Sequence, residues 1–528
     1  MAMDVDVLVA GAGPVGLTAA LHLARSGVSV RLIDAAPGPA TTSRALGTHA
    51  RSLEIYDLLG ILGDIAPHGT RVNAFVRHQG DRAMRVDFDF GDLSTRFPYM
   101  FNVDQVITER VLRGHVAARG VEVEWNTALE AFEQDQDGVT ATLHLPEGGA
   151  GTVRARYLWG CDGGHSTVRK ALGLPLTGEA AHTWLIADAT VHTDLDRDGV
   201  HWMFPGGGAL MAFPFPDPRR WRLLDTTGEG DPEEPEQIAR QFSTKLTRAL
   251  GVETQVERPT WASKFTIQQR AVPSMHAGRC FVSGDAAHVH SPASGQGLNT
   301  GIQDAYNLAW KLAMVVHGHA EPVLLDTYDA ERVPIGQALL ASTGEVMNTA
   351  MVDTDTEDSP TDTRDSDHGF MRQLIRSMSG LGIAYPDSAL TVPDDQPGEG
   401  PRPGQRLTQL SAADAQSPGG TAVRAALREP AWHLLVVAGS DDTTGPDGIR
   451  SLPTWLTTVT ISPHRHQEDD HGVWDPDGRI RQTLAATEGE WILVRPDGYL
   501  SARGTGDAGL RAALGRLPGL HTQELPHA

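Results

Sequence analysis

A glycine-rich turn near the N-terminus constrains the fold of this chain more than any other feature. An apolar run from Val5 to Ala10 predicts a buried strand, and Gly11, Gly13 and Gly16 follow it directly. The next residues have the pattern of a helix, and a second apolar run over 28–33 predicts another strand. This order predicts a strand–helix–strand unit of about 30 residues with Gly-x-Gly-x-x-Gly at its first turn. The fold class expected from it is α/β.

Each glycine of this turn has a separate physical role in a dinucleotide site. The first permits the tight turn, the second lets a pyrophosphate approach the backbone, and the third lets the helix pack closely on the strand. The helix N-terminus supplies free N–H groups and the positive end of the helix dipole. An acidic residue at the tip of the second strand can bind ribose hydroxyls. The residues expected to contact such a ligand are Gly11, Ala12, Gly13, Pro14, Val15, Gly16 and Asp34.

Length and charge limit the remaining choices. With 528 residues the chain exceeds one hydrophobic core, so two or three domains are expected. The formal net charge is -23, and the pI is about 5.3. A surface this acidic repels phosphate backbones and anionic lipids, so we expect neither nucleic acid nor a membrane as the main partner.

Two further features favour a cytoplasmic protein. The sequence contains only two cysteines, Cys161 and Cys280, which excludes a disulfide scaffold and a Cys-x-x-Cys zinc pattern. The apolar N-terminal segment has no basic start and is interrupted by Asp6 and the glycine turn, so we interpret it as strand, turn and helix. No stretch approaches the roughly 20 unbroken apolar residues that a membrane-spanning helix needs.

The domain organisation follows from composition and pattern. Strand-like segments dominate residues 181–270, with one helix near 235–250. An acidic polar run and then a segment rich in Pro, Asp and Gly predict a linker. We expect a discontinuous first domain over 1–180 and 271–350, a mainly β second domain over 181–270 with strands from 72–100, a linker over 351–400, and a smaller α/β domain over 401–528.

Two other motifs resemble a known family. "GCDGGHSTVR" ends a predicted strand in Asp162 and Gly163, and "GRCFVSGDAAHVHSPASGQGLNTGIQDAYNLAWKL" ends one in Gly284 and Asp285 before a helix. With the first turn they resemble the FAD-dependent aromatic hydroxylases, the group A flavoprotein monooxygenases of the p-hydroxybenzoate hydroxylase type, over about residues 4–350. The resemblance implies a Rossmann-like FAD-binding domain and a mainly β substrate-binding domain.

The C-terminal third is similar to a subgroup of that family. "PGQRL" at 403–407 and "ILVRPDGYLSAR" at 492–503 resemble the thioredoxin-like C-terminal domain of the polyketide and phenol hydroxylases. This domain lacks a Cys-x-x-Cys pair, so we expect a role in packing or oligomerisation, such as a homodimer, rather than thiol–disulfide exchange.

The resemblance also implies roles for individual residues. Asp34 would bind the adenosine ribose, although the family usually has Glu there. Arg44 and Gln105 would contact the pyrophosphate and ribityl region, Leu129 the adenine through its backbone, and Asp162 a phosphate. Asp285 would accept a hydrogen bond from the ribityl chain, and the helix beginning near Gly297 would direct N–H groups at the flavin. The remaining residues implied for this region are Gly284, Pro292, Gly295, Leu298 and Asn299.

The reaction implied by the family is aromatic hydroxylation. NADPH or NADH would reduce FAD, O₂ would form a C4a-hydroperoxyflavin, and one oxygen would pass to a phenolic or polycyclic polyketide substrate. We identify no catalytic base, and the catalytic residues stay unassigned; Arg44 and Pro292 are candidates for a catalytic role because the resemblance places them near the flavin. A Baeyer–Villiger or epoxidising enzyme of the same fold, and a non-enzymatic FAD-binding protein, remain alternatives. The Trp-x-Trp-x-Ile-Pro signature of flavin-dependent halogenases is absent.

The substrate site is less specific in sequence. Aromatic and Met side chains on adjacent predicted strands could be ordinary core or the wall of a pocket for an aromatic substrate. His288 and His290 have no third ligand near in sequence, so we expect turn or core histidines and no metal. The residues predicted to bind substrate are Trp202, Phe204, Met211, Phe213 and Phe215, with Arg222, Asp225 and Gln268 as further candidates.

Overall fold

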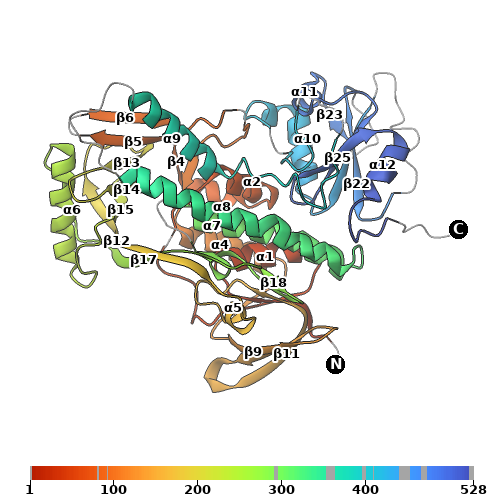
Figure 1. Ribbon diagram of the computed structural model, residues 1–528, viewed down its shortest axis with the longest axis horizontal. Coiled ribbons are helices and arrows are strands. Elements are labelled where there is room, and N and C mark those ends of the chain that lie inside the picture. The colour runs from red at the N-terminus through yellow and green to blue at the C-terminus, as the bar shows by residue number, and fades with distance from the viewer. Residues whose placement is uncertain are drawn as a thin grey trace.

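The described strands form three larger sheets and one small sheet, with helices packed on them (Figure 1). The sheet that carries α6 and the C-terminal sheet that carries α12 lie at opposite ends of the molecule, with α1 and α7 between them. The computed structural model describes residues 3–43, 45–79, 82–91, 93–289, 295–351, 363–394, 400–407, 410–438, 452–464 and 472–522.

The first sheet contains the strand–helix–strand unit that the glycine turn predicts. Its parallel core has the order β19-β11-β1-β2-β8, with β1 at the centre and fully buried at Val7, Leu8 and Val9. Helix α1 follows β1 and packs against α4 and α7. The strands are β1 (Val5–Ala10), β2 (Val30–Ile33), β8 (Val123–Glu124), β9 (Ala128–Gln134), β10 (Val139–His144), β11 (Ala150–Gly160), β18 (His276–Ala277) and β19 (Cys280–Val282), and the helices are α1 (Pro14–Arg25), α4 (Gln105–Ala117), α5 (Thr167–Ala171) and α7 (Gln296–Val316).

A small antiparallel sheet lies next to this unit and leads into α2. It has the order β3-β7-β4, and β7 pairs with both neighbours through Asn102. Its elements and those that follow it are β3 (Gly47–Thr48), β4 (Thr70–Val72), β7 (Met100–Asn102), α2 (Ala50–Leu58) and α3 (Leu62–Ile65).

The second sheet is mainly antiparallel and has the order β20-β17-β12-β15-β14-β13-β5-β6. Side chains alternate along β15, so Leu223 joins the apolar cluster under α6 while Leu224 joins the main core. The elements are β5 (Ala74–Gln79), β6 (Arg82–Asp87), β12 (Thr177–His192), β13 (Gly199–Met203), β14 (Leu210–Pro214), β15 (Arg220–Asp225), α6 (Pro235–Leu250), β16 (Gln255–Val256), β17 (Trp261–Ala271) and β20 (His288–Val289). Strands from the 72–100 region thus join strands from 181–270.

The stretch expected to be a linker, 351–400, differs from that expectation. Helix α8 (Asp326–Met351) is followed, after residues outside the described part, by α9 (Thr363–Ser379). Met371, Leu374 and Met378 of α9 are buried, at the spacing of a helix face that packs on a core. The acidic run before α9 continues into the helix at Asp365 and Asp367 and dominates the composition of this stretch, so the apolar period of the helix is easily overlooked.

The C-terminal sheet has the order β23-β22-β21-β24-β25, with parallel pairing from β23 to β21 and antiparallel pairing from β21 to β25. It forms a second apolar cluster with Trp310 of α7, so its core continues into the first part of the protein. Its elements are α10 (Pro418–Leu427), β21 (Trp432–Val437), β22 (Leu456–Ser462), β23 (Val473–Trp474), α11 (Arg479–Leu484), β24 (Glu490–Val494), β25 (Leu500–Thr505) and α12 (Gly506–Leu514).

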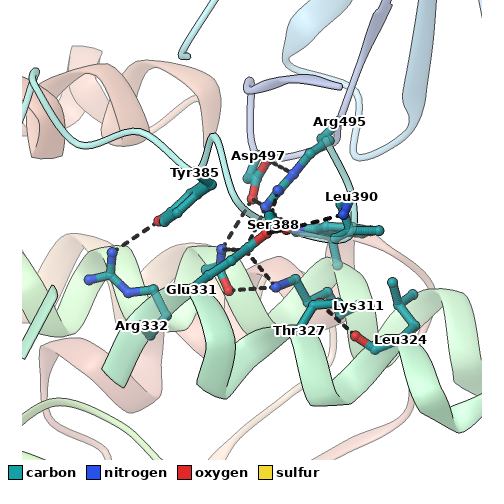
Figure 2. Close-up of polar contacts among 12 residues, drawn as sticks. Lys311, Leu324, Thr327, Glu331, Arg332, Tyr385, Ser388, Leu390, Arg495 and Asp497 are labelled. Atoms are coloured by element: carbon teal, nitrogen blue, oxygen red, sulfur yellow. Dashed lines mark hydrogen bonds and ion pairs between the residues drawn. The ribbon is translucent and has the colours of Figure 1, made fainter. Parts of the chain in front are cut away.

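A buried ionic cluster joins this C-terminal part to α7 and α8 (Figure 2). Glu331 of α8 accepts hydrogen bonds from Lys311 Nζ at 2.7 Å and from Arg495 Nη1 at 2.6 Å. Arg495 also donates to Asp497, whose carboxylate accepts from Trp310 Nε1 at 3.0 Å. Burial, partly offset by Glu331, lowers the pKa of Lys311 to about 8.

A second set of contacts ties the C-terminal part to α2. Arg51 donates to the backbone oxygen of Asp497 at 2.9 Å, and Arg406 donates to Glu54 at 2.7 Å. Asp57, at the end of the same helix, pairs with Arg428 at 2.7 Å. Because α2 follows directly on the β3 loop, the C-terminal part is anchored to the element that borders the cavity described next.

Candidate active site

A cavity of about 360 Å³ lies between the first and second sheets. This volume falls within the roughly 300–1,000 Å³ range of small-molecule sites. The cavity is bordered by the N-terminus of α1, the N-terminus of α7 and one face of β14 and β15. The lining residues are Gly13, Pro14, Val15, Ala45, Leu46, Gly47, Met100, Gln105, Cys161, Gly163, Ile186, Phe213, Arg222, Leu224, Ser283, Asp285, Val289, Gly295, Gly297, Leu298 and Met378.

The three glycines of the first turn differ in what surrounds them. A Cβ on Gly13 would have no atom within 4 Å, so the backbone at this point of the wall is open to the cavity. A Cβ on Gly16 would lie 1.9 Å from the Gly11 carbonyl oxygen, and one on Gly11 would lie 2.3 Å from the Cys161 oxygen. Gly11 and Gly16 are therefore required for close packing, whereas Gly13 leaves room for a ligand.

Asp34 lies at the tip of β2, as predicted, and contacts the turn. Its carboxylate accepts hydrogen bonds from the Ala12 N–H at 2.7 Å and from the Ala36 N–H at 2.8 Å. Each carboxylate oxygen has further acceptor capacity, so hydroxyl groups can still bind there. The shorter side chain of Asp, compared with Glu, keeps this carboxylate close to the backbone of the turn.

Asp162 follows the end of β11, and one of its two carboxylate oxygens has no hydrogen-bond partner among the described residues. Oδ2 accepts from the N–H groups of Thr167 and Val168 at the start of α5. Oδ1 is buried and has no partner among the described residues. Buried polar atoms of this kind are normally satisfied by a ligand or a water molecule. The neighbouring Cys161 lines the cavity, and burial raises the pKa of its thiol well above the ordinary value.

No side chain in the described part of the protein caps the N-terminus of α7. Gly295 precedes it with φ of 61°, a left-handed conformation that suits glycine. The Asn299 side chain donates to the Gly47 oxygen at 3.0 Å and accepts from the His49 N–H at 2.8 Å. Asn299 thus holds the β3 loop with its side chain, and only its backbone is available to a ligand. The uncapped N–H groups of this helix suit an anionic or electron-rich group.

A buried triad that sequence reasoning missed holds the Gly284 turn in place. Asp304 of α7 accepts from the Gly284 N–H at 3.1 Å, from His288 Nε2 at 2.6 Å and from Arg332 Nε at 2.8 Å. Burial acts to raise the pKa of Asp304, but His288 and Arg332 outweigh it and hold that pKa well below its usual range. The signal in the sequence is a set of polar residues at helical spacing within an otherwise buried helix: Gln303, Asp304, Asn307 and Lys311.

Gln105 holds the loop that carries the predicted Arg44. Its Oε1 accepts from the Ala45 N–H at 2.9 Å, while its Nε2 donates to Glu109 at 2.7 Å. Gln105 itself lines the cavity. Three predicted residues, Arg44, His290 and Pro292, lie outside the described residues.

The predicted substrate residues divide into two groups. Phe213 lines the cavity with Ile186 and Leu224. Trp202 and Met211 face each other across β13 and β14 in the main core but are not among the lining residues. The remaining two also lie off the described lining: Phe204 packs under Arg77, and Phe215 packs under Arg220 and Arg222.

Three other predicted positions also lie away from the cavity lining. Asp225 points to the opposite face of β15, where it accepts from Lys245 of α6 at 2.7 Å. Gln268 lies on β17, and its Oε1 is buried with no partner among the described residues. Leu129 lies on β9 opposite Leu143. Arg222, in contrast, is part of the lining.

Neither a metal centre nor a membrane span is found in the described part of the chain. No group of three or more His, Cys, Asp or Glu residues there is placed to hold a metal ion. His288 instead pairs with Asp304. No described helix combines the length and hydropathy needed to cross a bilayer.

Comparison with known proteins shows which family the chain belongs to. A profile of the FAD binding domain family matches residues 4–343. The chain is 43% identical over 527 residues to 6-methylpretetramide 4-monooxygenase of Streptomyces rimosus. This alignment covers 98% of this chain and 93% of that protein. The chain belongs to the FAD-dependent aromatic hydroxylase family.

Other members of the family agree with this assignment. The chain is 30% identical over 518 residues to pentachlorophenol 4-monooxygenase of Sphingobium chlorophenolicum, covering 96% of this chain and 95% of that protein. The solved structure of OxyS anhydrotetracycline hydroxylase from Streptomyces rimosus superposes with a TM-score of 0.71 at 30% identity, covering 97% of this chain and 99% of that one. The fold and family expected from the three motifs are confirmed, and the chain is an FAD-dependent monooxygenase.

The residues around the cavity fit the FAD that this family binds. Gly13 leaves an open approach to the backbone, one buried oxygen of Asp162 has no partner among the described residues, and no described side chain caps α7. These three features suit three different parts of a dinucleotide. The open backbone at Gly13 suits the pyrophosphate, the Asp162 oxygen suits a hydrogen-bond donor of the dinucleotide, and the start of α7 suits the electron-rich edge of a ring system. The apolar face of the second sheet closes the cavity opposite these features.

Proposed function

We propose that this monooxygenase uses NADPH or NADH and O₂ to hydroxylate an aromatic ring, either phenolic or part of a polycyclic polyketide. The observation that carries the proposal is the construction of the cavity. Its glycine turn and α7 N-terminus border it on one side, and Ile186, Phe213 and Leu224 of the second sheet border it on the other. Relatives named for a polyketide intermediate and for a chlorinated phenol support the substrate class.

The chain's own residues would bind FAD, orient the substrate and exclude water. Gly13, Asp34, Asp162 and Asp285 would hold FAD together with the α7 backbone, and Arg44, Leu129 and Pro292 are proposed as further contacts. When bound, FAD supplies the redox and oxygen chemistry. The apolar wall would align the substrate ring and keep water from the reacting atoms.

We further propose a domain organisation for the chain. Residues 1–180 and 271–350 would form the FAD-binding domain, and 181–270 with strands from 72–100 the substrate-binding domain. Residues 401–528 would form a thioredoxin-like domain that packs on the first, and the mixed sheet there supports this. A cytoplasmic location and a homodimer are also proposals; cell fractionation and sedimentation of the purified protein would test them.

The test is oxidation of NADPH and NADH by the FAD-loaded protein, with and without phenols, naphthoquinones and anthraquinones. We expect one class of compound to accelerate oxidation many-fold and to yield a product that contains one oxygen atom from ¹⁸O₂. A lactone or an epoxide as product would replace hydroxylation with ring-ketone insertion or epoxidation. Bound FAD without consumption of either coenzyme would overturn the proposed reaction.

A further inference from the structure

Arg222 is a residue of the cavity wall whose guanidinium group donates three hydrogen bonds within the described part of the protein. Its Nε donates to Asp188 Oδ1 at 2.8 Å, and its Nη2 donates to Asp188 Oδ2 at 2.9 Å. Nη2 donates a second time, to the backbone oxygen of Ser43 at 2.8 Å. A guanidinium group has five N–H donors, one on Nε and two on each terminal nitrogen. The two donors that remain are both on Nη1.

The position of Arg222 directs those two donors to the cavity. The residue lines the cavity and is 4% exposed. Its Nη1 atom has no hydrogen-bond partner among the described residues, but it is not fully buried, so part of its surface is accessible. The small accessible surface of the side chain is therefore cavity surface. Around it the wall is apolar, formed by Ile186, Phe213 and Leu224.

The guanidinium plane is held firmly. Its central carbon lies 5.4 Å from the ring centre of Phe215 and 5.5 Å from that of Trp261. Asp188 is 1% exposed and binds the guanidinium through both oxygens. A donor held in this way loses little conformational entropy when a ligand binds, so it can discriminate between ligands efficiently.

Among the described residues, the ion-paired charges next to Arg222 cancel, because Arg220 and Arg222 face Asp104 and Asp188. Asp188 pairs with Arg222, and Arg220 lies 3.4 Å from Asp188 and 3.6 Å from Asp104. Asp285 adds a carboxylate elsewhere on the lining. A negatively charged ligand would therefore gain little net attraction here, whereas a neutral oxygen acceptor would gain two unused, charge-assisted donors.

We propose that Arg222 is a substrate-specificity residue, whose Nη1 binds a neutral keto or hydroxyl oxygen attached to the aromatic ring. This inference rests on the proposed function and narrows its substrate class. The substrate would be an oxygenated ring without a carboxylate, such as a phenol or a hydroxyquinone. A ring of the same size without an oxygen would leave the two Nη1 donors unpaired in a buried site, and this is costly.

Binding of three small aromatic probes to the FAD-loaded protein tests the proposal. Naphthalene, 1-naphthol and 1-naphthoate have the same ring system, and their dissociation constants follow from changes in flavin absorbance at pH 7. We expect 1-naphthol to bind about 10- to 100-fold more tightly than naphthalene, the range for a hydrogen bond to a charged donor. 1-Naphthoate should bind more weakly than 1-naphthol.

Two variants separate recognition from structural support. In Arg222→Met the preference for 1-naphthol over naphthalene should fall to about onefold, while naphthalene binding changes little. Arg222→Lys keeps a positive charge beside Asp188 and is the milder variant. Its ammonium group would donate to Asp188 and Ser43 rather than to the ligand, so the preference for 1-naphthol should fall in this variant as well. Arg220→Met is the matched control, because Arg220 lies on the same strand but not on the cavity lining, and its preference should stay at the wild-type value.

The outcomes are distinct. Equal binding of 1-naphthol and naphthalene to the wild type, or an equal loss of both in the Arg222 variants, would overturn the role of Arg222 in recognition. Tightest binding of 1-naphthoate would overturn the preference for a neutral oxygen. The proposed function is tested separately by coenzyme oxidation, so failure there, with the probe preference intact, would overturn the reaction and leave the assignment of Arg222 standing.

Discussion

His288 Nε2 and Asp304 Oδ2 lie 2.6 Å apart in the buried space behind the Gly284 turn. The same carboxylate accepts from the Gly284 backbone and from Arg332, so one side chain of α7 fixes three other elements. The Gly284 turn, whose neighbours Ser283 and Asp285 line the cavity, is thus positioned by a charge that is not part of the cavity lining.

The first prediction concerns that carboxylate. Asp304→Asn leaves the Arg332 guanidinium without its counter-charge at a site that is 0% exposed. We expect a loss of about 3–5 kcal/mol in the free energy of unfolding, as for other broken buried ion pairs. Urea unfolding of the purified variant measures it. Asp285→Asn, at an exposed position on the cavity lining, is the control and should alter FAD affinity with little effect on unfolding; equal stability of Asp304→Asn and wild type would refute the prediction.

The second prediction contrasts two glycines of one turn. Gly13→Val has room for its side chain in the apoprotein, since no atom lies within 4 Å of the Cβ position, but fills the approach to the backbone. We expect normal apoprotein stability and at least about a 10-fold loss in FAD affinity, since lost backbone contacts to an anion are charge-assisted. Gly16→Ala should instead impair folding, because its Cβ would lie 1.9 Å from the Gly11 oxygen. Thermal melts and flavin fluorescence titration distinguish the two; tight FAD binding by Gly13→Val would count against this site.

The third prediction is a pH dependence. Burial lowers the pKa of Lys311 from 10.5 to about 8, so between these two pH values the unfolded chain holds more protons at this site than the folded chain. The contribution of Lys311 to the free energy of unfolding should therefore rise with pH across that window and be level below it. Lys311→Met removes this contribution. We expect the wild type to gain stability relative to Lys311→Met between pH 8 and 10, measured by urea unfolding; parallel curves would argue against the shifted pKa.

The fourth prediction concerns the docking of the C-terminal part. Arg495→Met removes the cation that binds the carboxylates of both Glu331 and Asp497, and Lys311 remains as the described cation that contacts Glu331. We expect a loss of about 3–5 kcal/mol in the free energy of unfolding, together with easier proteolysis between α9 and β21. Arg511→Met is the matched control, because the exposed Arg511 pairs with the partly exposed Asp507, and surface pairs of this kind contribute at most about 1 kcal/mol. A similar small effect in both variants would mean that the cluster in Figure 2 does not hold the two parts together.

The expectations from local sequence were accurate where a local constraint acts. The glycine turn requires a particular backbone path over six residues, and β1, α1 and β2 form around it as expected. The helix expected to begin near Gly297 is α7 (Gln296–Val316), because its start is defined by a Gly-Gln-Gly turn and its length by an apolar period. Composition misled only at α9, where an acidic neighbour hid the buried stripe of Met371, Leu374 and Met378.

The sequence by itself therefore determined the FAD-binding fold, the family and the residues of the glycine turns, since these depend on neighbours within a few positions. Only the tertiary structure decided which side chains share a cavity. Ser43 meets Arg222, Glu54 meets Arg406, and Glu331 meets Arg495, and no local pattern records these pairs. The physical reason is that alternation and periodicity predict which face of an element is buried, whereas the partner of a buried charge is decided by how distant elements pack.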